Sequence, residues 1–430
     1  MNTLPMNAFD DTHEPVTAVL APEVNVEQSF GIGELFFSRT DKRGVIESFN
    51  EVFLRISGFS SEELTGAPHK LIRHSDMPKA VFWLLWDGLK KNKPVGAYVK
   101  NRTKSGQYYW VFAIATPVED GYLSVRLRPT SELPEKVAAL YKDLLRKERD
   151  EELSPKDSAE ILLDELYDMG FPTYGNFQSY ALYQEFEARR KALKRTVCPD
   201  LHTSDIIAEH SKSLQFELSM LAEKFGHAGL LTANMKIFAA KLEVGRATIN
   251  EIAKNYDLML RDIQNNLSTM DVPEDPEGIW ETSKEQESFF MLCSSHLMSE
   301  LCETFEKESR QGSGINTDLE MAELIKLREA YKVKADEAVE YGMQVARSVQ
   351  RRNDFLQRMI LGLSTVRIAC RVEAGMLRDH AKGLNTIVSR LDSFHDEVES
   401  HLTKITLSVN AIIQSIDQHE LENAPQTVPS

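Results

Sequence analysis

The stretch "VGAYVKNRTKSGQYYWVFAIATPVEDGYLSVRLRP", residues 95–129, contains three runs rich in β-branched and aromatic residues, separated by the turns "TKSG" and "EDG". Such runs joined by short polar turns are typical of antiparallel strands. Upstream, "ELFFSRTDKRGVIESFN", residues 34–50, predicts two more short strands joined at Asp41–Gly44, where Gly44 can take a positive φ. Short helical turns and "PKAVFWLLWDGLKK", with Pro78 near a helix start, lie between the two groups. The sequence predicts an α+β domain with a five-stranded antiparallel sheet.

Polar residues directly precede the apolar helix in "LIRHSDMPKAVFWLLW", residues 71–86. Arg73, His74 and Asp76 in this stretch can be interpreted in two ways. Asp76 can cap the helix by accepting backbone N–H groups. Alternatively, the cation, imidazole and carboxylate line a ligand pocket.

Several motifs in this region occur in the order found in PAS domains, and the region resembles those of bacterial aerotaxis receptors. The motifs are an Asn before the first short helix, an Arg-His-x-Asp-Met-Pro box, a Lys-Asn-Arg strand and a Tyr-Trp-Val strand. The matching residues are Asn50, Arg73, His74, Asp76, Met77, Pro78, Lys100, Asn101, Arg102, Tyr109, Trp110 and Val111. The resemblance covers about 100 of the 430 residues, and the sequence departs from it at Ser75 and Val95.

The resemblance implies flavin adenine dinucleotide (FAD) in the PAS pocket and a role in sensing redox state or oxygen. We expect Asn50, Arg73, His74, Asp76 and Asn101 of the matching motifs to bind the cofactor, together with Trp86 and Trp110, which can supply aromatic walls. Haem is an alternative cofactor, because some related pockets hold haem through a histidine and His69 and His74 are available. A second alternative is a scaffold protein whose cofactor-free PAS domain serves for dimerisation.

Long charged helical patterns follow the predicted sheet. We expect a disordered lead-in at 1–27, the PAS domain at 28–132, a helical connector at 133–202, a helical bundle or coiled coil at 203–420 and a disordered tail at 421–430. Apolar residues at three- and four-residue spacing between 318 and 420 favour a coiled coil that folds back near Gly362 or Gly375, and at least a homodimer. "FAAKLEVGR" (238–246) and "IACRVEAGM" (368–376), 130 residues apart, indicate either a duplicated helical hairpin or a chance similarity.

The segment 230–263 is similar to the cytoplasmic tip of methyl-accepting chemotaxis proteins, which docks a histidine kinase and its coupling protein. Leu230, Leu231, Asn234, Ala239, Ala240 and Glu243 follow the family's order. The resemblance implies the same chemotaxis-type partners, with Leu230, Leu231, Asn234 and Glu243 as contact residues. A generic antiparallel bundle is the alternative.

Net charge, cysteine positions and motif spacing argue against several other functions. A net charge of −16 disfavours binding to nucleic acid or anionic lipid. Four scattered cysteines fit a reducing compartment, so we expect a cytoplasmic protein, and we find no signal peptide or transmembrane segment. The spacing of Cys293, His296 and Cys302 fits no zinc module, so no metal is expected among them. No nucleotide-binding motif accompanies His210, so we expect no enzymatic activity.

Overall fold

The computed structural model describes residues 20–196, 198–243, 245–268, 278–309, 317–377 and 382–423. The chain divides into two units. Of the described residues, those up to 201 and those from 278 to 336 form the sheet unit, and those from 202 to 268 and from 337 to 423 form the bundle unit. Helix α10 belongs to the sheet unit up to Asp336 and to the bundle unit from Glu337.

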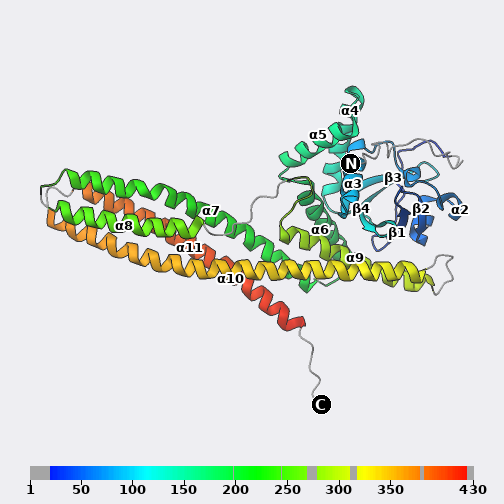
Figure 1. The fold of residues 1–430 in the computed structure, drawn as a ribbon. Coiled ribbons are helices and arrows are strands. Elements are labelled where there is room, and N and C mark those ends of the chain that lie inside the picture. The colour runs from blue at the N-terminus through cyan, green and yellow to red at the C-terminus, as the bar shows by residue number, and fades with distance from the viewer. Residues whose placement is uncertain are drawn as a thin grey trace, which may run out of the picture. The chain divides into compact units, whose positions relative to one another are not determined.

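The sheet unit contains the predicted five-stranded sheet (Figure 1). Its strands are β1 (Leu35–Asp41), β2 (Ile46–Phe49), β3 (Val95–Arg102), β4 (Tyr108–Val118) and β5 (Gly121–Leu127). They pair antiparallel in the order β2-β1-β5-β4-β3. The β1–β2 turn forms as expected, because Asp41 Oδ1 accepts the N–H groups of Arg43 and Val45 while Gly44 takes φ +82°. The predicted α+β fold is confirmed.

Short helices between β2 and β3 cover the inner face of the sheet. They are α1 (Glu51–Ser57), α2 (Ser61–Leu64), the 3-10 helix η1 (His69–Ile72) and α3 (Lys79–Lys90). Side chains alternate along each strand, so Tyr122, Ser124 and Arg126 of β5 face these helices while Leu123, Val125 and Leu127 face the other way. A polar row therefore lies on the inner face and an apolar row on the outer face.

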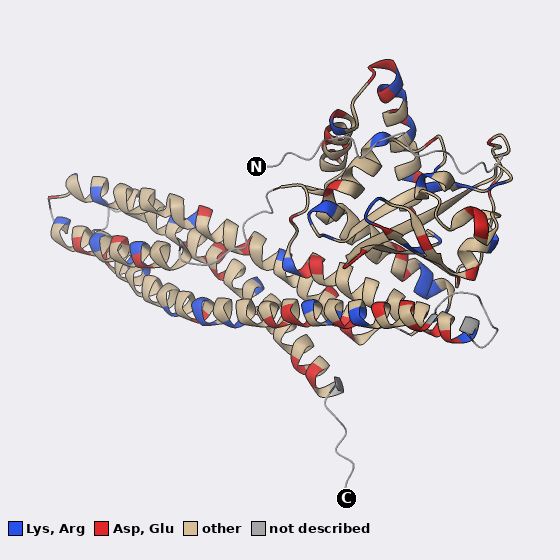
Figure 2. Cartoon of the chain, turned by 45° about the vertical axis from the view of Figure 1, so that its right-hand side comes forward, with Lys and Arg blue, Asp and Glu red and all other residues tan. Residues whose placement is uncertain are grey.

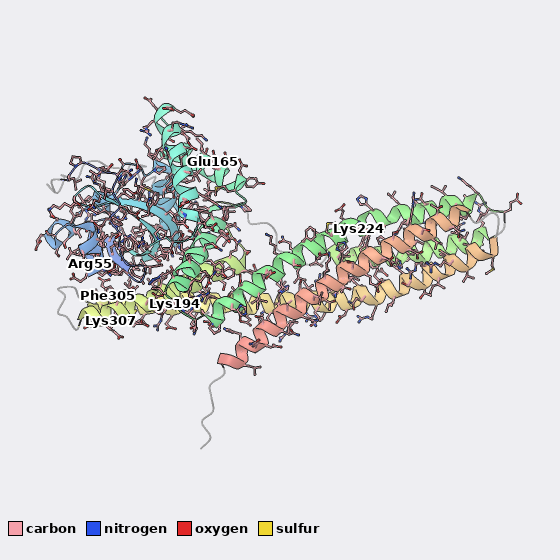
Figure 3. All side chains as sticks on the ribbon, turned by 180° about the vertical axis from the view of Figure 1, so that it is seen from behind. Arg55, Glu165, Lys194, Lys224, Phe305 and Lys307 are labelled. Atoms are coloured by element: carbon pink, nitrogen blue, oxygen red, sulfur yellow. The ribbon has the colours of Figure 1, made fainter. Side chains whose placement is uncertain are left out.

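Helices from distant parts of the sequence cover the apolar outer face. They are α4 (Leu133–Asp150), α6 (Tyr174–Ala192), α9 (Lys284–Ser309) and the start of α10 (Thr317–Leu377), with α5 (Pro155–Asp168) against α3. Phe305 of α9, labelled in Figure 3, packs edge-on against Phe37 of β1, and the ring centroids of the two residues are 5.1 Å apart. Tyr331 of α10 hydrogen-bonds Thr116 of β4 at 2.8 Å. Residues 276–336 thus group with the sheet, whereas the sequence placed them in the helical bundle at 203–420.

Part of the expected N-terminal lead-in is ordered against the sheet. Glu27 forms a β-bridge with Tyr108, and Val24 N–H donates to the Gly106 carbonyl at 2.8 Å. Glu23 accepts from Arg102 at 3.3 Å. Residues 20–27 therefore extend the sheet unit, while residues 1–19 and the tail from 424 lie outside the described residues. The expected disorder of those outer segments stays a prediction.

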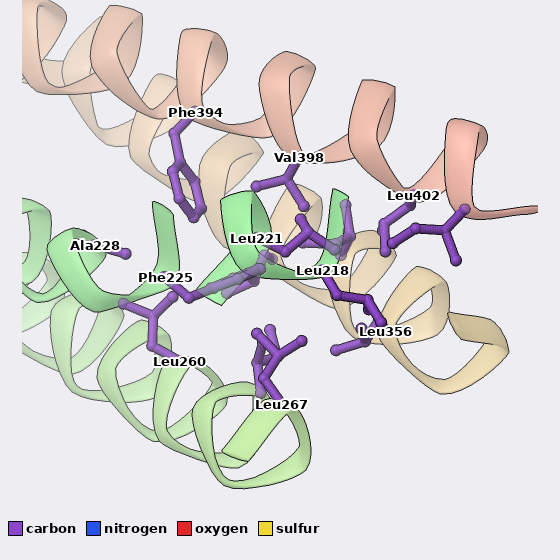
Figure 4. Packing of buried hydrophobic residues seen from close by; sticks show 14 of the residues in the cluster. Leu218, Leu221, Phe225, Ala228, Leu260, Leu267, Leu356, Phe394, Val398 and Leu402 are labelled. Atoms are coloured by element: carbon purple, nitrogen blue, oxygen red, sulfur yellow. The ribbon is translucent and has the colours of Figure 1, made fainter. Parts of the chain in front are cut away.

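The bundle unit consists of two antiparallel helical hairpins. The first pairs α7 (Pro199–Ala240) with α8 (Arg246–Ser268), and the second pairs the later part of α10 with α11 (Lys382–Asn423). Their apolar side chains meet in one core, where Leu221, Leu260, Leu356 and Val398 come from four different helices (Figure 4). Helix α10 runs through Gly362 without interruption and ends two residues after Gly375. The chain therefore reverses near the second of the two glycines predicted.

The two hairpins bury equivalent positions. Leu221 and Leu356 lie 135 positions apart, as do Leu267 and Leu402, and all four are in the core. The same separation relates Ala239 to Ala374 and Ile249 to Leu384, which form a second small cluster. An ion pair repeats as well, since Lys236–Asp257 (3.7 Å) in the first hairpin corresponds to Arg371–Asp392 (2.6 Å) in the second. The unit is a duplicated hairpin, in a register five residues away from that of the 130-residue sequence similarity.

Basic and acidic residues are interspersed along the long helices (Figure 2). Among the described residues, no helix has an apolar stretch of the length needed to cross a membrane.

Candidate functional site

A pocket lies between the inner face of the sheet and helices η1 and α3. It encloses about 360 Å³, within the range of roughly 300–1,000 Å³ that ligand pockets occupy. The small side chains of Ala113 and Ala115 line its floor on β4. Of the described residues that line it, none is acidic and four are basic, namely Arg43, Lys70, Arg73 and Arg126. The pocket therefore favours a ligand with negative charge.

Buried Arg126 and half-buried His69 form a pair in this pocket. Arg126 Nη2 lies 2.6 Å from His69 Nε2 and donates to Ser38 Oγ at 2.7 Å, whereas Nη1 has no hydrogen-bond partner within the described residues. Burial lowers the pKa of Arg126 to about 10. Burial and the neighbouring guanidinium lower the pKa of His69 to about 3, so its ring is neutral at pH 7.

Three of the seven cofactor residues predicted from the sequence line the pocket: Arg73, Trp86 and Asn101. The guanidinium of Arg73 lies 3.8 Å from the centre of the Phe82 ring and donates to the Met77 carbonyl at 3.0 Å. A backbone β-bridge joins Arg73 to Asn101. Trp86 approaches Gly44 so closely that a Cβ there would lie 3.2 Å from its ring.

The other four predicted residues lie outside the pocket. Asn50 is buried and joins β1 to α1, accepting from Phe37 N–H at 3.0 Å and donating to the Leu35 carbonyl at 2.9 Å. Asp76 pairs with Lys100 at 2.6 Å, and His74 lies 3.6 Å from the same carboxylate. Trp110 packs on Tyr141 of α4, with ring centroids 6.3 Å apart. These contacts join strands of the sheet to neighbouring helices and to the segment before α3.

Two buried carboxylates connect the PAS region to the helices that follow. Glu148 of α4 accepts from the backbone N–H groups of Lys79 (2.7 Å) and Ala80 (3.3 Å), and so caps α3 in the place expected for Asp76. Glu185 of α6 accepts from the Tyr98 hydroxyl at 2.7 Å and from Thr130 N–H at 2.6 Å. The start of α3 and the end of the sheet are therefore each tied to a later helix.

Sequence reasoning missed Arg126, although a signal for it exists. In "GYLSVRLRP" the residues Tyr122, Ser124 and Arg126 alternate with leucine and valine, so a strand places all three on one face. A charged residue in that row marks a polar pocket on the inner face. The sequence indicates His69 only as a possible haem ligand, because its contact with Arg126 joins positions 57 residues apart.

The four predicted partner-contact residues lie at the end of the first hairpin. Leu230 is 65% exposed, whereas Leu231 and Asn234 are half-buried on α7. Glu243 is exposed in the turn that follows α7. Leu231 packs against the bundle core, so its side chain is shared between the core and the surface.

Known proteins resemble the first part of the chain. The family described as PAS fold matches residues 46–124. The aerotaxis receptor of Escherichia coli (strain K12) is 45% identical over 112 residues, which are 25% of this chain and 22% of the receptor. The chain thus spans about a fifth of that relative's length.

Two solved structures are similar over the same region. The PAS domain of a Colwellia psychrerythraea protein is 18% identical, covering 22% of this chain and 86% of that one, with a TM-score of 0.21. The light state of the blue-light photoreceptor Aureochrome1 LOV is 17% identical, covering 25% and 90%, with a TM-score of 0.22. Together with the antiparallel sheet, the family match identifies residues 46–124 as a PAS domain.

Proposed function

We propose that this protein is a signal-transduction sensor whose PAS domain responds to redox state or oxygen through a bound flavin, with FAD as the expected form. The observation that carries the proposal is the pocket with four basic and no acidic residues among the described residues that line it. The 45% identity to an aerotaxis receptor across this region supports it.

The pocket residues suit a flavin in chemical type. Asn101 offers both a donor and an acceptor to a ring edge, and Trp86 and Phe82 offer apolar walls. Arg126 Nη1 is a buried donor without a partner among the described residues, as a site for a ligand oxygen would have. Lys70, which is exposed, brings positive charge suited to phosphate groups, whereas the charge of Arg43 is paired with Asp41 at 2.8 Å.

A flavin supplies a group that accepts electrons and changes its charge and hydrogen bonding when it does so. Arg126 and Asn101 would respond to that change, because both lie in the pocket on strands of the sheet. Two sets of contacts connect the pocket to the helices that follow the sheet. One passes from Arg73 through the start of α3 to Glu148, and the other from β3 through Tyr98 to Glu185. No catalytic turnover is needed.

Haem is the less suitable cofactor for this pocket. His69 Nε2 points at the Arg126 guanidinium, which opposes an iron cation in the same place, and His74 lies outside the pocket. The absorption spectrum of the purified protein is the direct test. A yellow protein with bound FAD supports the proposal, a red one indicates haem, and a colourless protein that takes up no added FAD contradicts it and favours the scaffold alternative.

We further propose that the bundle unit conveys the signal to a chemotaxis-type histidine kinase and its coupling protein through Leu230, Leu231, Asn234 and Glu243. The exposure of Leu230, at 65%, supports a contact there. Capture of the coupling protein by the full chain, lost with Leu230→Ser and retained with Leu407→Ser on α11, is the expected result. Equal capture by both variants would contradict the assignment. The cytoplasmic location stays a prediction.

A further inference from the structure

Three side chains of metal-binding type, two at the start of α7 and one on α9, meet where the first segment of the sheet unit ends. Cys198 precedes α7, Asp200 lies in the first turn of α7, and His296 lies on α9. Cys198 Sγ is 3.0 Å from His296 Nε2, and the ligand atoms of all three residues lie within 4.8 Å of one another. All three are half-buried, so solvent reaches the cluster.

Two glutamates near this cluster are paired with arginines. Glu300, one turn after His296 on α9, forms ion pairs with Arg189 and Arg195. Glu187 is held by Arg190 through both of its oxygens. The carboxylate that reaches the thiol and the imidazole is therefore that of Asp200.

The spacing suits a tetrahedral metal ion. Zinc binds cysteine sulfur at about 2.3 Å and histidine nitrogen at about 2.0 Å, which places the two ligand atoms about 3.5 Å apart. The observed 3.0 Å between Sγ and Nε2 is a hydrogen-bond distance, so binding requires the pair to open by about half an ångström.

We propose that Cys198, Asp200 and His296 form a binding site for Zn²⁺ or a divalent transition metal of similar preference, with water in the fourth position. When the ion binds, the thiol proton of Cys198 passes to solvent and a bond forms between Sγ and the metal. Cys293, one turn before His296, is fully buried and is not among the proposed ligands. Spacing along the sequence could not reveal the site, because Cys198 and His296 are 98 positions apart.

The position of this site gives it a structural consequence. Residues 198–201 are the last of the first segment of the sheet unit, and the bundle unit begins at His202. A metal ion there would join the first turn of α7 to α9 within the sheet unit.

Metal binding by the full-length chain tests the proposal. Protein stripped with a chelator is titrated with Zn²⁺ alone against a chromophoric competitor, and with Co²⁺ for its thiolate charge-transfer absorption. We expect one ion per chain and affinity reduced by about tenfold or more in Cys198→Ser and His296→Gln. Cys302→Ser and Cys370→Ser are matched controls and should bind as the unaltered protein does. Absence of binding, or binding equally tight in Cys198→Ser and His296→Gln, overturns the site.

A second measurement covers the case in which those variants do not fold. In the unaltered protein, bound Zn²⁺ should slow alkylation of Cys198 by iodoacetamide by about tenfold or more, measured on the peptide by mass spectrometry. A Cys198 alkylation rate that Zn²⁺ leaves unchanged would refute the proposal without any variant.

Discussion

Arg126 Nη2 donates to His69 Nε2 across 2.6 Å at the inner face of the sheet. Because a guanidinium has only donors, Nε2 must be the acceptor and the single ring proton of His69 is on Nδ1. The pair thus holds one full positive charge beside a neutral base. No acidic residue is among the described residues that line the pocket. The charge of Arg126 is therefore left for a ligand to balance.

Replacing Arg126 by methionine should stabilise the cofactor-free protein and weaken cofactor binding. A buried charge without a carboxylate partner destabilises a fold by on the order of 1–3 kcal/mol, and methionine fills similar space without that charge. We expect cofactor-free Arg126→Met to melt several degrees higher in calorimetry and to retain less FAD after purification. Arg126→Lys keeps the charge and is the control. Full FAD occupancy in Arg126→Met would show that the guanidinium does not hold the ligand.

Pocket geometry and family resemblance make different predictions for Asp76. The resemblance makes Asp76 a cofactor residue, whereas its carboxylate pairs with Lys100 at 2.6 Å outside the pocket. We expect Asn101→Ala and Arg73→Ala to lower the FAD-to-protein absorbance ratio, because both side chains line the pocket. Asp76→Asn should leave the ratio unchanged. If instead Asp76→Asn lowers the ratio and Asn101→Ala and Arg73→Ala do not, the cofactor lies beside Asp76 and outside this pocket.

The sequence predicted the sheet because strand composition and turn residues are local signals. The family motifs predicted Arg73 and Asn101 as pocket residues, and Trp86 was predicted as an aromatic wall, but neither signal gives the geometry of the pocket. It could not predict that α9 and the start of α10 cover the sheet, because Phe305 and Tyr331 lie more than 200 positions from their partners Phe37 and Thr116. The apolar outer row of the strands indicates only that some cover is needed.

Glu148→Gln should destabilise the sheet unit. The carboxylate of Glu148 accepts two N–H groups at the start of α3, where Pro78 provides no side-chain cap. An amide keeps the shape but loses the charge that favours a helix N-terminus, at a cost of about 1–2 kcal/mol. Urea unfolding followed by circular dichroism measures the change. Glu151→Gln, an exposed neighbour just past α4, is the control and should unfold as the unaltered protein does.

His395 makes the bundle unit sensitive to acid. Its ring lies 3.2 Å from the Tyr256 hydroxyl, and burial together with Arg367 lowers its pKa to about 4 from 6.5. A histidine with a lowered folded-state pKa binds its proton mainly when unfolded, so its contribution to stability is complete above pH 6.5 and is lost as pH falls towards 4. His395→Gln should flatten the pH dependence of unfolding by up to about 1.4 kcal/mol per pH unit in this window. The exposed His202→Gln should not.

The duplicated hairpin predicts that the bundle forms within one chain. The apolar stripe between 318 and 420 predicts at least a homodimer, whereas α7 and α8 of the same chain supply the other half of the core that α10 and α11 form. An obligate dimer melts at a temperature that rises with protein concentration, whereas a core closed within one chain does not. We therefore expect the same melting temperature from about 0.1 to 100 μM, with any association of chains confined to exposed surface. Asp257→Asn and Asp392→Asn remove equivalent ion pairs of the two hairpins, and each should lower the free energy of unfolding by about 0.2–1 kcal/mol. A melting temperature that rises steadily with concentration would instead show that two chains build the bundle together.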